Sequence, residues 1–218
     1  MGILALGGGA FDVPVCDWVT ERLPSGRPSV VMLPTATADA PEAVVRFYEL
    51  FGRRSVVVSH VGLHVVPPDD ARERIAAADA IMVSGGNTAN ALAIWRLHGI
   101  DDALRSAWQR GALLWGSSAG MICWFEAGVT DSFRAALDGM RDGLGFLSGS
   151  ACPHYDGEEL RRPVYERLVR DEDFPPGVAA DDGCGLWYEG RELRQVLSFR
   201  EGARAYRVTP GGSAPLDL

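Results

Sequence analysis

The most constraining feature of this chain is an apolar run, 112–115, that ends in Gly116-Ser117-Ser118-Ala119-Gly120. A Gly-x-Ser-x-Gly pattern between a strand and a helix is typical of a sharp turn that presents a serine as a nucleophile. Such a turn is crowded, and glycine at both ends removes side chains that would clash with the neighbouring strand and helix. The pattern therefore predicts a strand-to-helix turn with Ser118 at its tip. The alternative is a glycine-rich turn in which Ser117 caps the following helix.

Backbone donors for a developing oxyanion are expected on two sides of this serine. A helical pattern follows it through Met121 and Trp124, and N–H groups at the start of a helix suit negative charge. A second glycine-rich turn, 84–88, follows another apolar run. We expect the N–H groups of Gly86 and Ala119 to form an oxyanion hole. Asn87 is expected to contact substrate or to cap the next helix.

Short apolar runs alternate with amphipathic stretches along most of the chain. This alternation predicts an α/β fold, a three-layer sandwich with a mostly parallel central sheet flanked by helices. Beyond residue 145 the pattern changes, and it ends in a predicted C-terminal β-hairpin. Strands are expected at 2–6, 29–33, 55–60, 80–84, 112–115, 151–155 and 178–189, helices at 12–22, 41–51, 69–77, 88–98, 102–110 and 157–170, a hairpin at 192–208 and a flap or surface loop within 131–150.

Composition narrows the class of protein. A chain of 218 residues with 47% hydrophobic residues can bury a sizeable core, and we expect one domain over residues 1–218. The net charge of −8 disfavours nucleic acids and anionic membranes as partners. No apolar stretch is long enough to span a bilayer, and the N-terminus lacks the basic start of a signal peptide, so a cytoplasmic location is expected. Apolar sheet edges would allow a homodimer.

The cysteines and histidines indicate neither a disulfide framework nor a metal site. Four cysteines lie far apart without a Cys-x-x-Cys pair, and the four histidines are dispersed. We therefore expect no metal. Cys152 and His154 would share one face of a strand, which leaves a Cys-His nucleophile as an alternative.

A serine nucleophile needs a base, and the base needs a group that orients it. His154 is the only histidine after Ser118, and it follows a predicted strand. The interval between them is too short for an ordinary α/β-hydrolase, in which the acid precedes the histidine. His60 and His64 flank Gly62 in a predicted loop and could be surface residues.

Two acids compete to orient His154. Asp156 lies two residues after it, in the layout His-x-acid. Asp182 lies at the end of a later strand, just before Gly183, where a carboxylate can reach a neighbouring strand's imidazole. Asp181 would point to the opposite side of a regular strand. Ordinary turn chemistry is the alternative for all three, because Asp before Gly is a common turn pair.

Together these residues resemble the peptidase E (aspartyl dipeptidase) family of serine peptidases. The resemblance implies the α/β fold of class I glutamine amidotransferases, which is flavodoxin-like. It also implies that Ser118 is the nucleophile, His154 the base and Asp182 the acid, with the Gly-Gly-Asn turn in the oxyanion hole. The His-x-acid layout of Asp156 is the one that glutamine amidotransferases use, with cysteine in place of serine, so Asp182 ranks first. The motifs that carry the resemblance are Gly7-Gly8-Gly9, Ser84-Gly85-Gly86-Asn87-Thr88, Gly116-Ser117-Ser118-Ala119-Gly120, Pro153-His154-Tyr155 and Asp182-Gly183.

The reaction implied by the resemblance is hydrolysis of dipeptides or short peptides with N-terminal Asp through an acyl-enzyme, without metal or organic cofactor. An Asp side chain needs a cation in the pocket, and the family has an arginine close to Arg161 and Arg162. Arg161 is the candidate, with a solvated helix face as the alternative for at least one of the two. Another hydrolase on the same fold, cyanophycinase-like or esterase-like, and a non-catalytic binding protein stay open.

Overall fold

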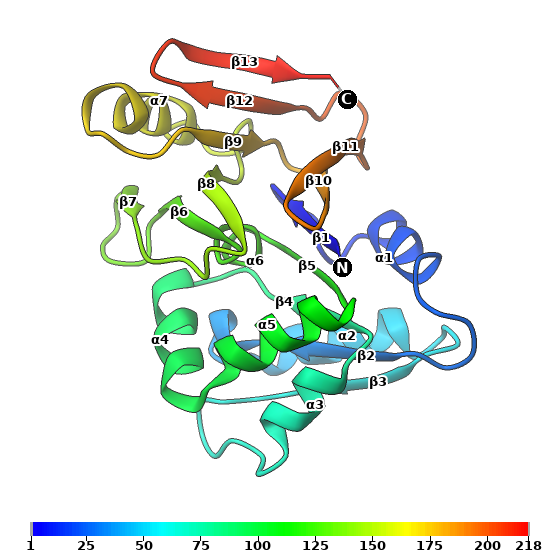
Figure 1. Cartoon of the computed structure of the whole chain (residues 1–218). Helices are drawn as coiled ribbons and strands as arrows, with labels where there is room; N and C mark the ends of the chain where they lie inside the picture. The colour runs from blue at the N-terminus through cyan, green and yellow to red at the C-terminus, as the bar shows by residue number, and fades with distance from the viewer. Residues whose placement is uncertain (1, 218) are drawn as a thin grey trace.

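A computed structural model, which describes residues 2–217, places two β-sheets side by side with helices packed around them (Figure 1). In the seven-stranded sheet, β1, β5, β4, β2 and β3 run parallel; beyond β1, β10 pairs antiparallel with β1 and β11 pairs antiparallel with β10. Its order is β11 (Glu192–Ser198), β10 (Cys184–Glu189), β1 (Gly2–Leu6), β5 (Leu113–Ser117), β4 (Ala80–Val83), β2 (Ser29–Leu33) and β3 (Val57–His60).

The six-stranded sheet is built from the second half of the chain. Its centre is parallel, because β6 pairs with β8 and β8 with β9 in the same direction. Antiparallel strands β7, β12 and β13 flank this centre. The order is β13 (Gly212–Leu216), β12 (Ala205–Thr209), β9 (Gly177–Ala180), β8 (Leu147–Cys152), β6 (Phe125–Thr130) and β7 (Asp138–Met140).

Helices cover both faces of the first sheet, as predicted for a three-layer sandwich. Alternate residues of β1 face opposite ways: Ile3 packs with the core beside α3–α5, and Leu4 packs with the core beside α1 and α2. Both faces are therefore buried, which explains the continuous apolar runs. The helices are α1 (Val13–Thr20), α2 (Pro41–Phe51), α3 (Ala71–Ala77), α4 (Thr88–His98), α5 (Ile100–Arg110), α6 (Ala119–Ile122) and α7 (Arg161–Asp171), with a short 3₁₀ turn η1 (Thr35–Thr37).

The second half of the chain differs from the sequence prediction in three places. The expected strand 178–189 is divided by a turn, where Cys184 N–H donates to the Asp181 carbonyl (3.0 Å), and its parts join different sheets. The expected hairpin 192–208 does not form, because β11 pairs with β10 whereas β12 pairs with β9 and β13. The helix after Ser118 is only one turn long, since Phe125 already pairs with Leu147 in the second sheet. A short buried apolar run does not distinguish a helix from a strand.

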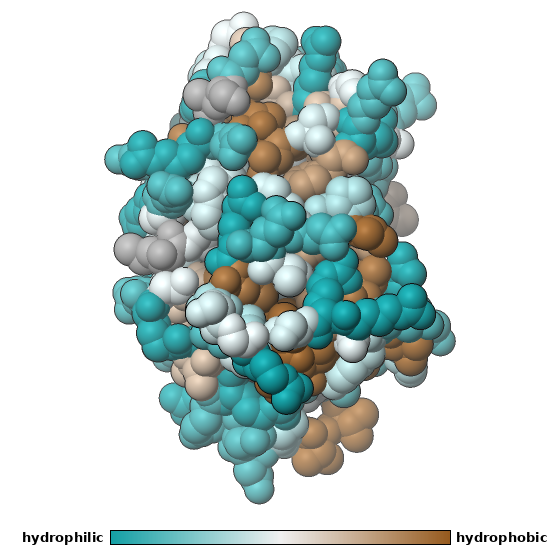
Figure 2. All heavy atoms as spheres, turned by 90° about the vertical axis from the view of Figure 1, so that its right-hand side faces the viewer, coloured by the Kyte–Doolittle hydropathy of each residue, from teal (hydrophilic) through white to brown (hydrophobic). Residues whose placement is uncertain are grey.

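Hydrophobic side chains lie mainly inside. Figure 2 shows the face at the right of Figure 1: hydrophilic residues cover most of it, and hydrophobic ones emerge between them in separate patches. The large hydrophobic side chains that are most exposed include Val65, Val66 and Leu97. Across residues 2–217, none of the helices combines the length and the apolar character that a bilayer crossing requires.

Candidate active site

The turn that carries Ser118 is strained. Ser118 has φ 58° and ψ −115°. Residues other than glycine rarely adopt this backbone conformation, and it often marks a functional site. The predicted crowding is confirmed. A Cβ on Gly116 would lie 2.5 Å from the Val83 carbonyl oxygen, and one on Gly120 would lie 2.4 Å from the same atom. The serine is thus held at the carboxyl end of β5 by close backbone packing on both sides.

The turn after β4 lies beside this serine. Gly86 has φ +118°, and the next N–H, of Asn87, donates to the Ala36 carbonyl (2.8 Å). The predicted capping role of Asn87 is confirmed, because its Oδ1 accepts a hydrogen bond from Asn90 N–H (2.9 Å) at the start of α4. Its Nδ2 donates to the Ser132 carbonyl (3.0 Å). A contact between Asn87 and substrate stays a prediction.

If the Gly86 N–H is an oxyanion donor, as the sequence predicts, Gly86→Ala should lower kcat by roughly 10²- to 10³-fold, the usual cost of losing one such donor. An added Cβ would lie 2.1 Å from the Ala36 carbonyl oxygen, so the turn must move and its N–H with it. We also expect a loss of about 1–3 kcal/mol in the free energy of unfolding. Steady-state kinetics and urea unfolding measure the two effects.

Gly26→Ala is the matched control for this variant. Gly26 also has a positive φ, +102°, but a Cβ there would meet nothing within 4 Å. Gly26→Ala should therefore lower the free energy of unfolding without changing kcat. Full activity in Gly86→Ala would exclude the Gly86 N–H from the oxyanion hole.

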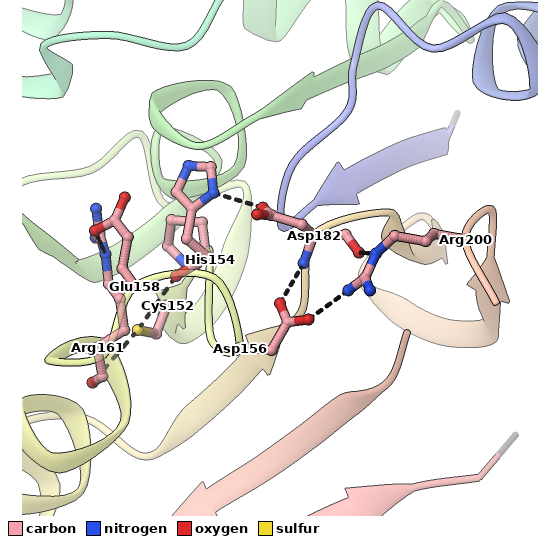
Figure 3. Close-up of polar contacts among 8 residues, drawn as sticks. Cys152, His154, Asp156, Glu158, Arg161, Asp182 and Arg200 are labelled. Carbon is pink, nitrogen blue, oxygen red and sulfur yellow. Dashed lines mark hydrogen bonds and ion pairs between the residues drawn. The ribbon is translucent and has the colours of Figure 1, made fainter. Parts of the chain in front are cut away.

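His154 and Asp182 come together from two neighbouring parallel strands (Figure 3). His154 follows β8 and Asp182 follows β9, and His154 Nδ1 donates to Asp182 Oδ1 at 2.6 Å. The histidine backbone is also strained, with φ 53°. Its side chain is 22% exposed and that of Asp182 is 42% exposed, so the pair borders solvent. An imidazole held at Nδ1 has its Nε2 available for proton transfer.

The end of β1 connects this pair to the serine. Ser118 N–H donates to the Leu6 carbonyl (3.3 Å), and Gly8, two residues further on, forms a parallel bridge with Asp182. The carboxyl ends of strands from both sheets therefore place Ser118, His154 and Asp182 at the same end of the molecule. In open α/β sheets, ligands bind at this end, beyond the carboxyl ends of the parallel strands.

Asp156 contacts the backbone of Asp182 rather than the imidazole of His154. Its Oδ1 accepts a hydrogen bond from Asp182 N–H (2.9 Å), and its other oxygen pairs with the Arg200 guanidinium (Figure 3). Arg200 Nε also donates to the Asp182 carbonyl (2.8 Å). Desolvation alone would raise the pKa of Asp156, but the Asp182 N–H and Arg200 outweigh it and hold this pKa below the ordinary value. Asp156 and Arg200 thus fix the backbone that carries Asp182.

Asp181 has a different partner from Asp182. Its side chain is buried, and Oδ2 accepts a hydrogen bond from Arg204 N–H (2.9 Å). Its Oδ1 is buried without a hydrogen-bond partner among residues 2–217. Desolvation raises the pKa of this carboxyl above its ordinary value. Asp181 is therefore a structural acid whose ionisation disfavours the folded state.

The pH dependence of stability should reveal this acid. Because folding raises the pKa of Asp181, protonation of its carboxyl stabilises the folded state. This stabilisation is fully present below the unfolded-state pKa and is lost as pH rises through the folded-state pKa. Asp181→Asn removes this titration, so the free energy of unfolding of the variant relative to wild type should rise from pH 4 to pH 7. Urea unfolding at several pH values measures it. A difference independent of pH would contradict the argument.

A pocket of about 290 Å³ contains Ser118, and its lining comes from segments that follow strands β4, β5, β6 and β8. Gly86 and Asn87 follow β4, Ser118 follows β5, Asp131 follows β6, and Glu158 and Arg161 lie beyond β8. The pocket thus combines a candidate nucleophile and a candidate oxyanion donor with charged groups of both signs.

Arg161 and Arg162 have different environments. Arg161 is 3% exposed, yet it lines the pocket; its Nε donates to Glu158 Oε2 (2.7 Å) and its Nη1 to the Val129 carbonyl (2.7 Å). Arg162 instead lies over the rings of Tyr155 and Tyr206, at 4.6 and 4.8 Å from their centroids. The structure therefore gives the pocket one buried cation, at the residue that the sequence singled out.

The sequence did not single out three residues that lie at or near this site: Asp131, Glu158 and Arg200. Glu158 lies three residues before Arg161, a spacing at which a carboxylate and a guanidinium can meet near a helix start, and this signal was available. Asp131 follows β6, a strand that the sequence did not predict. Arg200 gave no signal, because its role depends on how the chain bends between β11 and β12.

Cys152 does not fit the alternative of a Cys-His nucleophile. Its thiol is buried and lies 3.7 Å from the Pro153 carbonyl oxygen and 3.9 Å from that of Arg161 (Figure 3). Burial raises the pKa of Cys152 to about 12, so the thiol is protonated at neutral pH. A protonated, buried thiol is a poor nucleophile.

A larger hollow of about 940 Å³ lies at the other end of the strands, around Gly2, Gly111 and Leu113. Its described lining has no serine, cysteine or histidine, and its Arg194 is paired with Glu189 and Glu192. The smaller pocket, which holds Ser118, is therefore the candidate active site. Among residues 2–217, no group of three or more His, Cys, Asp or Glu side chains is placed to hold a metal ion.

Comparison with known proteins shows the family of this chain. The sequence model of peptidase family S51 matches residues 3–196. The chain belongs to peptidase family S51. It is 42% identical over 211 residues to a protein named "Uncharacterized peptidase YgaJ" from Bacillus subtilis strain 168, covering 94% of this chain and 91% of that one. It is 29% identical over 137 residues to Peptidase E from Shewanella denitrificans, covering 59% and 58% of the two chains.

Solved structures show the same fold. A peptidase from an acI-B1 Actinobacterium superposes with a TM-score of 0.71 at 17% identity, covering 100% of this chain and 94% of that one. A protein from Listeria monocytogenes EGD-e, described as a candidate peptidase E, gives a TM-score of 0.70 at 16% identity, covering 91% and 98%. Together with the family match, these findings place the chain in the peptidase E family and make it a peptidase.

Proposed function

We propose that this peptidase is a serine hydrolase that cleaves dipeptides or short peptides with N-terminal aspartate through Ser118, His154 and Asp182. The observation that carries the proposal is the 2.6 Å hydrogen bond between His154 and Asp182, at the strand ends that also carry the strained Ser118. A serine, an imidazole and a carboxylate that fixes the imidazole are the parts of an acyl-transfer site.

The reaction proceeds in two steps. Ser118 Oγ attacks the scissile carbonyl carbon while its proton passes to His154 Nε2, and the N–H groups of Gly86 and Ala119 donate to the oxyanion. His154 returns the proton to the leaving amine as the C–N bond breaks, which leaves the acyl group on Ser118. Water then attacks the ester, losing its proton to His154, and the acid is released as Ser118 recovers a proton. Asp182 holds the imidazole and stabilises its charged form throughout.

Arg161 supports the preference for aspartate. It is buried, fixed by two hydrogen bonds from its guanidinium, and still lines the pocket with Ser118. A guanidinium has five N–H donors, so it can donate to a substrate carboxylate as well. We expect the β-carboxylate of the substrate to accept hydrogen bonds from the Arg161 guanidinium.

The test is a dipeptide panel (Asp-Leu, Glu-Leu, Ala-Leu and β-Asp-Leu) combined with fluorophosphonate labelling mapped by mass spectrometry. Cleavage of Asp-Leu alone, with the label on Ser118, is the expected result. Cleavage of β-Asp-Leu alone would favour a cyanophycinase-like hydrolase. Labelling without turnover would indicate another substrate, and neither labelling nor turnover would indicate a binding protein.

A further inference from the structure

A third hollow, of about 350 Å³, is lined by residues of both β-sheets, where β10 contacts β9 and β12 (Figure 1). Its lining comes from the starts of β8 and β9 and the ends of β10 and β12. His154 and Asp182 follow the opposite ends of β8 and β9. This hollow therefore shares two strands with the candidate active site, but none of the residues that line the Ser118 pocket.

The charged side chains that line this hollow are all positive. Arg191 and Arg207 line it and no Asp or Glu does, although the net charge of the chain is −8. Neither guanidinium has a hydrogen-bond or ion-pair partner among residues 2–217. Glu189 and Glu192 lie close to Arg191 in the sequence, but both pair with Arg194 (3.6 and 2.6 Å). Two unpaired guanidiniums in one concave site attract an anion.

A buried tyrosine adds a hydrogen-bond donor to the two arginines. Tyr188 is only 6% exposed and lines the hollow, yet its hydroxyl has no hydrogen-bond partner within the described residues 2–217. Burial raises the pKa of Tyr188 and outweighs the opposite effect of the Arg207 charge, so the hydroxyl is protonated at neutral pH. Buried tyrosine hydroxyls usually have a hydrogen-bond partner, and an anion beside Arg207 would supply one.

Apolar side chains line the hollow beside these polar groups. Phe125, Val178 and Val208 belong to this lining and also to the buried core. The rings of Phe125 and Tyr188 meet edge to face, with their centroids 5.9 Å apart. An inorganic anion would leave the apolar lining in contact with water, whereas an organic anion with an aliphatic tail would cover it.

We propose that this hollow binds a small aliphatic carboxylate without a positive charge, whose carboxylate accepts hydrogen bonds from Arg191, Arg207 and Tyr188. The lining has no acid that could accept an ammonium group, so a free amino acid would have to desolvate its own ammonium without a partner. Glu126 lies outside the lining, and its carboxylate accepts a hydrogen bond from Gly149 N–H (2.7 Å). This binding goes beyond the proposed function and does not depend on it.

The test compares 4-methylpentanoate with leucine, which is the same molecule with an α-ammonium group added. Isothermal titration calorimetry at neutral pH measures both dissociation constants on the wild-type protein. Leucine is expected to bind about tenfold more weakly or worse, and so is 4-methylpentanol, which lacks the carboxylate. Equal binding of 4-methylpentanoate and leucine would overturn the proposal. Inorganic phosphate that binds as tightly as 4-methylpentanoate would overturn it too, because phosphate has no apolar tail.

Two variants place the ligand in this hollow. Arg207→Gln should weaken the binding of 4-methylpentanoate by about ten- to a hundredfold, the usual effect of losing a hydrogen bond between charged groups. Tyr188→Phe keeps the ring and removes only the hydroxyl, and it should weaken binding by about tenfold. Urea unfolding checks that each variant is folded. A folded Arg207→Gln protein that binds as tightly as wild type would reject the site.

Arg170→Gln is the matched control, because it removes the same charge outside the hollow. Arg170 lies in α7 and pairs with Asp171 (3.0 Å). Its substitution should leave the dissociation constant of 4-methylpentanoate unchanged. If Arg170→Gln weakened binding as much as Arg207→Gln, net charge rather than a defined site would govern the affinity, and the proposal would fail.

Discussion

Ser118→Ala is expected to lower kcat for Asp-Leu hydrolysis by about 10⁴-fold or more. Without the Oγ no acyl-enzyme can form, and the remaining groups can only assist direct attack by water. Release of leucine, followed over hours at high enzyme concentration, measures the residual rate. Fluorophosphonate labelling should disappear in the same variant. Retention of more than about a tenth of the wild-type activity would remove Ser118 from the mechanism.

A glycine at the same position separates chemistry from strain. Ser118→Gly should lose activity as fully as Ser118→Ala, because both lack the hydroxyl. Glycine tolerates φ 58° and ψ −115°, whereas alanine keeps the strain of serine. We expect the free energy of unfolding of the glycine variant to exceed that of the alanine variant by about 1 kcal/mol. Equal stability would mean that this turn stores no strain.

The parallel part of the first sheet was predictable because its elements are local. Strands 2–6 and 29–33 and helices 41–51 and 88–98 begin and end where the sequence predicts. Each is a short periodic segment, and Pro41 and Gly99 mark helix ends by fixing or freeing φ. Burial on both faces made the parallel strands continuous apolar runs, which differ clearly from the amphipathic helices between them.

The second sheet was not predictable, because its partners are set by tertiary contacts. The run from Met121 to Phe125 has apolar residues at helical spacing, yet Phe125 enters β6 to pair with Leu147. Residues 126–130 carried no clear strand pattern of their own, so the strand end before Asp131 was not predicted. The serine, the histidine and the glycine turn were recognisable because each occupies a short motif. Asp131 and Arg200 lie outside such motifs, and only the fold brings them to the site.

Asp182→Asn is expected to lower kcat for Asp-Leu by about 10⁴-fold. His154 Nδ1 donates to Asp182 Oδ1, and an amide at this position can present a donor that forces the imidazole into the wrong tautomer. The developing imidazolium also loses its counter-charge. Steady-state kinetics on Asp-Leu measure the effect, and circular dichroism with urea unfolding checks that the variant is folded.

Asp156→Asn is the matched comparison, because the sequence left both acids open as partners of His154. Asp156 contacts the backbone N–H of Asp182 and the Arg200 guanidinium, so its loss should loosen the acid without removing the charge that faces the imidazole. We expect a fall in kcat of only about tenfold, equivalent to roughly 1.4 kcal/mol in the barrier. If Asp156→Asn were the more damaging variant, the orienting acid would be Asp156. A large effect of Asp182→Asn with a small one of Asp156→Asn would mean that the direct contact with the imidazole, rather than total negative charge near it, governs the rate.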